Sequence, residues 1–205
     1  MKAGKPKNAG STAAQAGPDR TLRIIGGAWR GRKIRFPPVE AVRPTPDRVR
    51  ETVFNWLQQD MAGARCLDLY AGSGALGLEA LSRGAAQVVF VEVDQAVGWH
   101  LSQMLAQLGC DRGQVVRADA TRYLEGVPQP FDIAFLDPPF AERALEDTCR
   151  RLDECGWLRM GGLAYLEAPA ATGVPVLPVG WTLLRSKRAG EVGYHLARRG
   201  PSTGE

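Results

Sequence analysis

The chain has 205 residues, of which 44% are hydrophobic and 23% charged, and its formal net charge at pH 7 is +4. This length and hydrophobic content suffice for one well-buried domain with a short appendage. The sequence has no apolar run long enough to span a membrane and no stretch that resembles a signal peptide, so we expect a soluble, cytoplasmic protein.

Cysteine and histidine residues are few and widely spaced. They are Cys66, Cys110, Cys149, Cys155, His100 and His195. Since no CxxC pair is present and the two histidines are far apart, we expect no metal site and reduced structural thiols.

Positive charge is concentrated near the N-terminus. Residues 20–50 carry nine basic and two acidic side chains, a net charge of +7, whereas residues 51–205 are net acidic. A basic segment on an acidic body indicates that one end of the molecule binds a polyanion, although a solvated basic face is the alternative. The basic side chains that we expect to contact the polyanion are Arg23, Arg30, Arg32, Lys33, Arg35, Arg43 and Arg48.

The N-terminal quarter of the chain divides into three predicted parts. Residues 1–20 are rich in Gly, Ala, Ser, Pro and Lys and are expected to form a disordered basic leader. Strands are predicted at 22–25 and 33–36, joined as a hairpin. A helix then begins with Thr45 as its N-cap and Pro46 at its first helical position. We group residues 21–60 as an N-terminal hairpin and helix.

Strand and helix patterns alternate from residue 65 onward. Strands are predicted at 66–70, 88–93, 115–118, 131–136 and 163–167, helices at 75–83, 95–108 and 143–154, and a closing hairpin at 181–188 and 191–197. This alternation predicts an α/β domain, residues 61–199, with a mostly parallel sheet covered by helices on both faces. A short tail, residues 200–205, follows it.

A glycine-rich segment follows the strand at 66–70. The run from Gly72 to Gly77 matches G-x-G-x-x-G at a strand-to-helix junction, and Glu92 lies twenty residues after Gly72 at the end of the next strand. In such folds the glycines admit the close approach of a nucleotide-containing ligand, and the acidic residue binds ribose hydroxyls. This pattern alone fits NAD as well as S-adenosylmethionine.

Two further features favour S-adenosylmethionine. Asp119 ends the third strand, where the adenine amino group of the cofactor needs an acceptor, and the Asp137-Pro138-Pro139-Phe140 loop has no role in a nicotinamide enzyme. The residues expected to contact the cofactor are Asp68, Tyr70, Ala71, Gly72, Ser73, Gly74, Glu92, Asp119 and Ala120. Asp68 either holds the cofactor's ammonium group or orders the glycine turn, and Asp94 is interpreted as a helix cap.

The Asp137-Pro138-Pro139-Phe140 loop predicts methyl transfer to the exocyclic amino group of a nucleobase. Such an amine is a poor nucleophile because its lone pair is delocalised into the ring. Asp137 and the backbone carbonyl of Pro138 can each accept one N–H bond, which aims the lone pair at the methyl donor. Phe140 can stack on the base. We therefore predict Asp137, Pro138 and Phe140 as the catalytic residues.

Several motifs together point to a known family. They are Arg23-Ile24-Ile25-Gly26-Gly27, Trp29-Arg30-Gly31-Arg32, Arg43-Pro44-Thr45, Asp47-Arg48-Val49-Arg50-Glu51, the glycine-rich segment extended from Ala71 to Ala80, and Asp137-Pro138-Pro139-Phe140. With these motifs the chain resembles the bacterial 16S ribosomal RNA guanine-N2 methyltransferases of the RsmD family. The resemblance spans residues 22–198.

The resemblance implies a class I S-adenosylmethionine-dependent methyltransferase fold, with a Rossmann-like seven-stranded sheet and an N-terminal β-hairpin extension. It also implies methylation of one guanine N2 in 16S rRNA within a partly or fully assembled small ribosomal subunit, with the basic N-terminal segment bound to RNA. The family motifs place Arg43, Thr45 and Arg48 near the active site. We expect a monomer.

Other functions remain open at this point. An adenine-N6 methyltransferase would use the same amine clamp, although the chain has no segment that resembles a DNA recognition domain. A non-catalytic RNA assembly factor on the same scaffold would be expected to have a damaged clamp or glycine turn, and both are intact. A nicotinamide oxidoreductase is disfavoured by the loop at Asp137.

Overall fold

The computed structural model describes residues 20–36, 45–139 and 144–201. The elements in chain order are β1 (Arg20–Arg23), η1 (Gly27–Trp29), β2 (Lys33–Phe36), α1 (Asp47–Trp56), β3 (Arg65–Asp68), α2 (Ala75–Ser82), β4 (Gln87–Glu92), α3 (Gln95–Gln107), β5 (Gly113–Arg117), α4 (Ala120–Leu124), β6 (Phe131–Leu136), α5 (Ala144–Glu154), β7 (Leu158–Pro169), β8 (Thr182–Ala189) and β9 (Val192–Arg198). The leader before residue 20, Arg43, Phe140, Arg143 and the tail after residue 201 lie outside the described residues.

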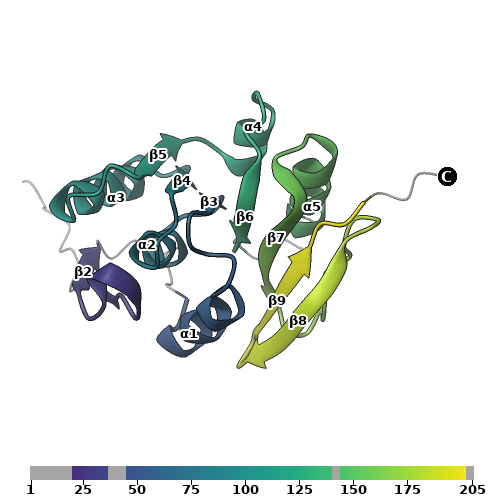
Figure 1. The fold of residues 1–205 in the computed structure, drawn as a ribbon, viewed down its shortest axis with the longest axis horizontal. Coiled ribbons are helices and arrows are strands. Elements are labelled where there is room, and N and C mark those ends of the chain that lie inside the picture. The colour runs from purple at the N-terminus through teal and green to yellow at the C-terminus, as the bar shows by residue number, and fades with distance from the viewer. Residues whose placement is uncertain (1–19, 37–44, 140–143, 202–205) are drawn as a thin grey trace, which may run out of the picture.

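A seven-stranded sheet forms the centre of the molecule, in the order β5-β4-β3-β6-β7-β9-β8 (Figure 1). Strands β3 to β7 are parallel, and β9 lies antiparallel between β7 and β8. The chain runs outward from β3 to β5 and then returns to place β6 beside β3. The pair β3 and β6 is therefore the topological switch point, at whose carboxyl ends ligands bind in such sheets.

Helices cover both faces of this sheet (Figure 1). Because successive side chains of a strand point to opposite faces, Cys66 and Phe90 pack under α1, α2, α3 and the N-terminal hairpin, whereas Leu67 and Val89 pack under α4 and α5. Both clusters are fully enclosed. The fold class predicted from the alternating pattern is thus confirmed.

The N-terminal hairpin is fixed to α2 by one buried carboxylate. Glu79 Oε2 accepts the N–H of Ile25 at 2.9 Å, and Glu79 Oε1 accepts the N–H of Gly26 at 2.8 Å. Ser82 Oγ accepts the N–H of Trp29 at 2.9 Å. Leu22 and Ile34, which pair across the hairpin, belong to the same core cluster as the sheet. The hairpin is therefore a rigid part of the domain surface.

Arg50 is fully buried, although it lies in the basic segment of residues 20–50. Its guanidinium donates to Glu79 Oε2 at 3.3 Å and to Asp47 Oδ1 at 2.5 Å. It also donates to the backbone carbonyls of Arg23 and Thr45. Arg50 thus joins α1, α2 and the hairpin, and its charge is not available to an external polyanion.

The predicted N-cap of α1 is wrong. Pro46 occupies the N-cap position, without a side-chain capping bond, and the helix begins at Asp47. Thr45 Oγ1 instead donates to Glu167 Oε1 at 3.2 Å. A distant acceptor on β7 has therefore taken the hydroxyl that local sequence would assign to the helix end.

Other differences from the predicted elements are small. Strand β7 begins at Leu158 rather than 163, because its register with β6 shifts around Gly161 and Gly162, which interrupt the apolar pattern. Helix α4 was not predicted, since five residues are too few to show a helical period. No helix among the described residues is long and apolar enough to cross a membrane.

Candidate active site

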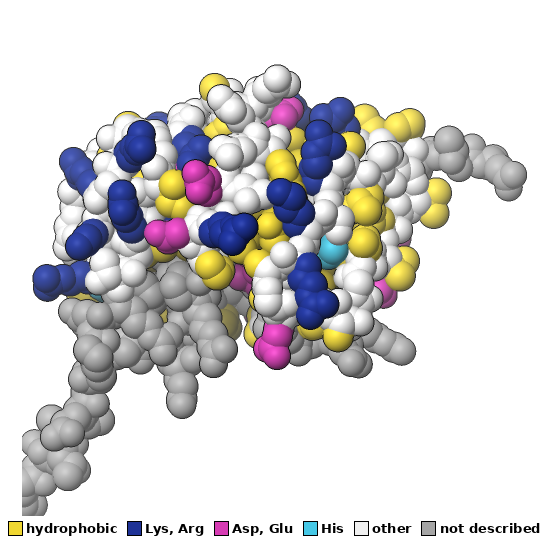
Figure 2. All heavy atoms as spheres, turned by 90° about the horizontal axis from the view of Figure 1, so that it is seen from below, with side chains coloured by type: hydrophobic (Ala, Val, Ile, Leu, Met, Phe, Trp, Pro, Cys, Tyr) yellow, Lys and Arg dark blue, Asp and Glu magenta, His cyan; other side chains and the backbone are white. Residues whose placement is uncertain are grey.

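The predicted site residues gather at one edge of the sheet. Asp68 ends β3, Glu92 ends β4, and Asp137 directly follows β6. Strands β7 and β8 are both antiparallel to β9, so β8 runs in the same direction as the parallel strands. The arrowhead of β8 in Figure 1 therefore marks the carboxyl edge of the sheet. Figure 2 looks onto this side of the molecule and shows many Lys and Arg side chains among few acidic ones.

The turn between β3 and α2 requires its glycines. Gly72 has φ +48° and Gly74 has φ +73°, a left-handed backbone conformation that residues other than glycine rarely adopt. A Cβ on Gly77 would lie 2.1 Å from the Phe90 ring, so the third glycine allows α2 to pack closely against β4. These are the roles that the G-x-G-x-x-G pattern predicts, namely a tight turn and a close helix.

Glu92 connects the end of β4 to this turn. Its Oε2 accepts the N–H of Gly72 at 2.8 Å, and its Oε1 accepts the N–H of Asp94 at 2.8 Å. The residue is half-buried. Each carboxylate oxygen has a second lone pair, so the side chain can still accept two hydroxyl donors from a ribose.

Asp68 lies beneath the glycine turn. It is 3% exposed, and its Oδ2 accepts the N–H of Gly77 at 2.9 Å. Burial raises the pKa of Asp68 to about 7; the charge of Glu92 adds to this shift, and the bond from Gly77 opposes it. Asp68 therefore orders the turn, which is one of the two roles expected from the sequence. Its other oxygen, Oδ1, takes no part in this bond and could accept from the cofactor's ammonium group, the second expected role.

Asp119 and Asp94 both cap helices. Asp119 Oδ1 accepts the N–H groups of Thr121 at 2.9 Å and of Arg122 at 3.2 Å, which makes it the N-cap of α4. Its other oxygen is not used in these bonds, and the residue is exposed while Ala120 beside it is buried. Asp94 caps α3 in the same way, as the sequence predicted.

The remaining predicted cofactor residues line the same turn. The Tyr70 hydroxyl lies 2.8 Å from Thr148 Oγ1 on α5, which fixes the ring at the edge of the sheet. Ala71 N–H donates to Val91 O at 3.0 Å, and Ser73 is buried within the turn. The structure thus brings every predicted cofactor residue to the carboxyl ends of β3, β4 and β5.

Asp137 lies beside a carboxylate that sequence reasoning did not identify as part of the site. Leu136 of β6 pairs with Leu166 of β7, so the next residues along each strand, Asp137 and Glu167, are neighbours. Burial raises the pKa of Asp137 well above its ordinary value, and the charges of Glu167 and Asp68 raise it further. Pro138 is buried next to it.

Glu167 is held by two hydroxyl groups. Its Oε1 accepts the Tyr165 hydroxyl at 2.7 Å and the Thr45 hydroxyl at 3.2 Å, and the residue is 5% exposed. Burial raises the pKa of Glu167, against the effect of these two bonds. The sequence shows an acidic residue at the end of the strand at 163–167. Only the strand order shows that this strand lies next to the one bearing Asp137.

The basic residues of the hairpin face solvent. Arg23 pairs with Lys33, and Thr21 with Arg35, on the side opposite the buried Leu22 and Ile34. Of the basic residues predicted to contact a polyanion, those that the structure describes are all exposed, namely Arg23, Arg30, Arg32, Lys33, Arg35 and Arg48. A rigid hairpin thus carries its cations outward at the surface of the domain.

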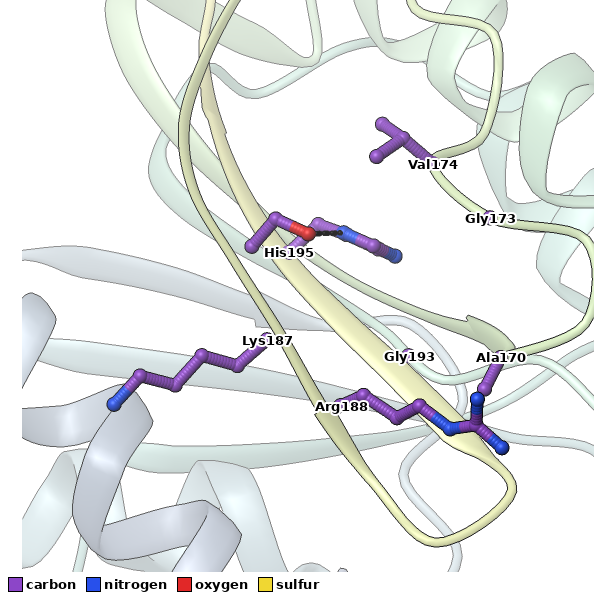
Figure 3. Close-up of a pocket in the computed structure, with 8 residues that line it drawn as sticks. Ala170, Gly173, Val174, Lys187, Arg188, Gly193 and His195 are labelled. Atoms are coloured by element: carbon purple, nitrogen blue, oxygen red, sulfur yellow. Dashed lines mark hydrogen bonds between the residues drawn. The ribbon is translucent and has the colours of Figure 1, made fainter.

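A separate pocket lies at the other face of the sheet, near the β8–β9 turn (Figure 3). Ser186 Oγ lies 2.9 Å from Nδ1 of His195, whose Nε2 is buried without a hydrogen-bond partner among the described residues. Figure 3 shows Lys187 directed away from His195. Because His195 pairs with Leu166 whereas Tyr194 pairs with Glu167, this pocket opens on the face opposite Glu167.

Comparisons with known proteins show the family of the chain. The family model "Conserved hypothetical protein 95" matches residues 22–198. Ribosomal RNA small subunit methyltransferase D of Escherichia coli K12 is 48% identical over 178 residues, which cover 87% of this chain and 90% of that protein. The chain belongs to the ribosomal RNA small subunit methyltransferase D family. The protein of the same name in Haemophilus influenzae is 42% identical, over 85% of this chain and 92% of that protein.

A solved structure agrees with membership in the ribosomal RNA small subunit methyltransferase D family. A putative methyltransferase from Escherichia coli, yhhF, has a TM-score of 0.83 and 47% identity, and the match covers 88% of this chain and 99% of that chain. The family resemblance seen in the sequence and the class I methyltransferase fold are therefore both confirmed.

Proposed function

We propose that this chain transfers a methyl group from S-adenosylmethionine to the exocyclic N2 amino group of a guanine in 16S ribosomal RNA. The observation that carries the proposal is the adjacency of the glycine turn and the amine clamp. Asp68 of β3 pairs with Phe135 of β6, two residues before Asp137. A cofactor on the turn and a base on the clamp then meet at the switch point of the sheet.

The chain's own groups fit the cofactor. The N-terminus of α2, at the left-handed Gly74, favours the carboxylate of its methionine part, and Asp68 lies beneath for the ammonium. Glu92 serves the ribose hydroxyls, and the unused oxygen of Asp119 serves the adenine amino group. When bound, S-adenosylmethionine supplies a methyl group made electrophilic by its sulfonium.

Asp137 has two tasks at the target amine. With the Pro138 carbonyl it accepts the two N–H bonds, which directs the nitrogen lone pair toward the methyl donor. As the nitrogen gains positive charge, Asp137 accepts the proton that the product amine releases. Burial and the neighbouring carboxylates raise the pKa of Asp137, and a more basic carboxylate is a better proton acceptor for this step.

The N-terminal segment, residues 21–60, supplies the RNA contact in this proposal, and residues 61–199 the methyltransferase domain. Six exposed cations on or near a hairpin that is fixed by Glu79 can bind phosphates at a set distance from the clamp. The names of the relatives support a ribosomal RNA substrate. We propose a cytoplasmic monomer that acts on the small ribosomal subunit.

The test is product analysis. Purified small subunits from a strain that lacks the gene are incubated with the protein and methyl-labelled S-adenosylmethionine, and the nucleosides are identified by mass spectrometry. N2-methylguanosine at one position is the expected product. N6-methyladenosine would instead establish the adenine enzyme, and no transfer to subunits or to free 16S rRNA would favour the assembly factor.

A further inference from the structure

We propose that Glu167 makes the site specific for guanine by accepting the N1–H of the target base beside the N2 amine held at Asp137. The inference rests on the function proposed above and adds a residue to it. It starts from the register of β6 and β7, which places these two side chains together.

Both carboxylates lie on the same face of the sheet. Phe135 pairs with Tyr165, and their rings are 6.3 Å apart, so both point to the face covered by α1. Glu167 lies two residues further along β7, and Asp137 lies two residues after Phe135, directly past the end of β6, which returns both side chains to that face. Adjacent strands are about 4.8 Å apart, so two hydrogen-bond acceptors stand side by side at the edge of the sheet.

Guanine presents a matching pair of donors. Its Watson–Crick edge carries the N2 amine next to N1–H, whereas adenine carries its N6 amine next to N1 without a hydrogen. With the amine at Asp137, the neighbouring carboxylate would receive a hydrogen bond from guanine but would face a lone pair on adenine. A site built for a donor rejects a base that lacks it, because its own polar group is then left unpaired.

The contacts of Glu167 leave one oxygen available for this role. Tyr165 and Thr45 both donate to Oε1, so neither occupies Oε2. Burial of the residue to 5% exposure holds the side chain in one place. Thr45 follows Arg43-Pro44 in the sequence and lies two residues before the start of α1, so the N-terminal segment reaches the specificity site through this bond.

The Glu167→Gln variant tests the inference sharply. Its amide oxygen can still accept from Tyr165 and Thr45, while an NH₂ group replaces Oε2, so an acceptor becomes a donor. Small subunits are reconstituted with guanosine or 2-aminopurine at the target position. 2-Aminopurine keeps the amine at carbon 2 but has an unprotonated N1. Single-turnover methylation of both substrates is measured with saturating S-adenosylmethionine.

We expect the preference of the wild type for guanosine over 2-aminopurine to fall by about 100-fold or more in Glu167→Gln. The missing O6 of 2-aminopurine affects both proteins and cancels in this comparison of ratios. Tyr165→Phe and Thr45→Val are the matched controls, because each removes one donor to Oε1 and leaves Oε2. They should slow both substrates alike.

Three results have different meanings. An unchanged ratio in Glu167→Gln overturns the inference and leaves Glu167 as a structural link between β7 and Thr45. An equal change of ratio in Tyr165→Phe and Thr45→Val overturns it too, since a loosened side chain would then explain the effect. Failure of the wild type to form N2-methylguanosine in the guanosine subunits refutes the proposed function itself.

Discussion

Glu92 Oε2 accepts the backbone N–H of Gly72 at 2.8 Å and so joins the end of β4 to the glycine turn after β3. The same carboxylate is the expected ligand of the cofactor ribose. We therefore expect a single side chain both to shape the turn and to bind the ligand. Asp94, two residues after Glu92, has a different role, because its side chain accepts two N–H groups at the start of α3 and caps that helix.

Replacement of Glu92 should weaken cofactor binding. We expect Glu92→Ala to raise the dissociation constant of S-adenosylmethionine by tenfold or more, equivalent to about 1.4 kcal/mol. Isothermal titration calorimetry on a folded variant measures this. Asp94→Ala is the control: loss of the cap should cost about 1 kcal/mol of stability and leave the dissociation constant unchanged. An unaltered constant in Glu92→Ala removes Glu92 from the cofactor site.

The exposed hairpin cations should set the salt dependence of RNA binding. Each phosphate contact removed lowers the slope of log affinity against log salt by about one unit. Joint replacement of Arg30, Arg32 and Lys33 by alanine should flatten the slope and leave cofactor affinity intact. Arg150→Ala, at an exposed position of α5 on the other face of the sheet, is the control. An unchanged slope in the triple variant would move the RNA site elsewhere.

Asp68 should make the stability of the cofactor-free protein depend on pH. Its pKa is about 7 in the folded chain, whereas an aspartate in an unfolded chain titrates near 4. Between these values the folded state holds a proton that the unfolded state lacks, so the free energy of unfolding falls as pH rises. Asp68→Asn keeps an acceptor for Gly77 and should remove this decrease, about 2–4 kcal/mol.

Urea denaturation at pH 5 and pH 8 measures the effect. Asp137 and Glu167 also have raised pKa values and contribute in the same direction, so only the difference between wild type and Asp68→Asn isolates Asp68. Equal pH dependence in the two proteins would show that Asp68 is ionised at neutral pH in the fold.

Glu79 should be the main attachment of the N-terminal hairpin. Glu79→Ala removes the acceptor of two backbone N–H groups and leaves the buried Arg50 charge without this partner. The loss of one partner of a buried pair costs about 3–5 kcal/mol, which denaturation in urea can measure. Glu154→Ala, which breaks an exposed pair with Arg150, should cost under about 1 kcal/mol. A similar small loss in Glu79→Ala would mean that the hairpin is held by its apolar face alone.

Much of the fold could be predicted because strand and helix periods differ. The run at 131–136 is apolar except for Asp132 and is bounded by Pro130 and Pro138, and the structure has β6 over Phe131–Leu136. Local signals failed where distant contacts decided the outcome. Thr45 has the side chain of an N-cap, yet Glu167 on β7 binds its hydroxyl, and Arg50 looks like a surface cation until α2 supplies Glu79.

The site was predictable where its residues follow strand ends in sequence motifs. Gly72, Gly74 and Glu92 follow a known spacing, and the structure brings them together. Glu167 was missed because its position beside Asp137 depends on the order of the strands. Residues 137 and 167 are thirty positions apart in the chain, and only the pairing of Leu136 with Leu166 makes them neighbours.

The turnover of Asp137→Ala tests the central claim most directly. In the proposed function Asp137 acts on an amine that gains charge only as the methyl group transfers, so its loss should lower the rate of the chemical step by roughly 10²–10⁴-fold. Phe140→Ala, made for comparison, should mainly weaken binding of the base, by about 1–3 kcal/mol. The measurement is single-turnover methylation of small subunits with saturating S-adenosylmethionine, on variants shown to be folded and to bind the cofactor normally. A loss of turnover of this size with unchanged cofactor affinity is the predicted result, and near-normal turnover by Asp137→Ala would contradict the account.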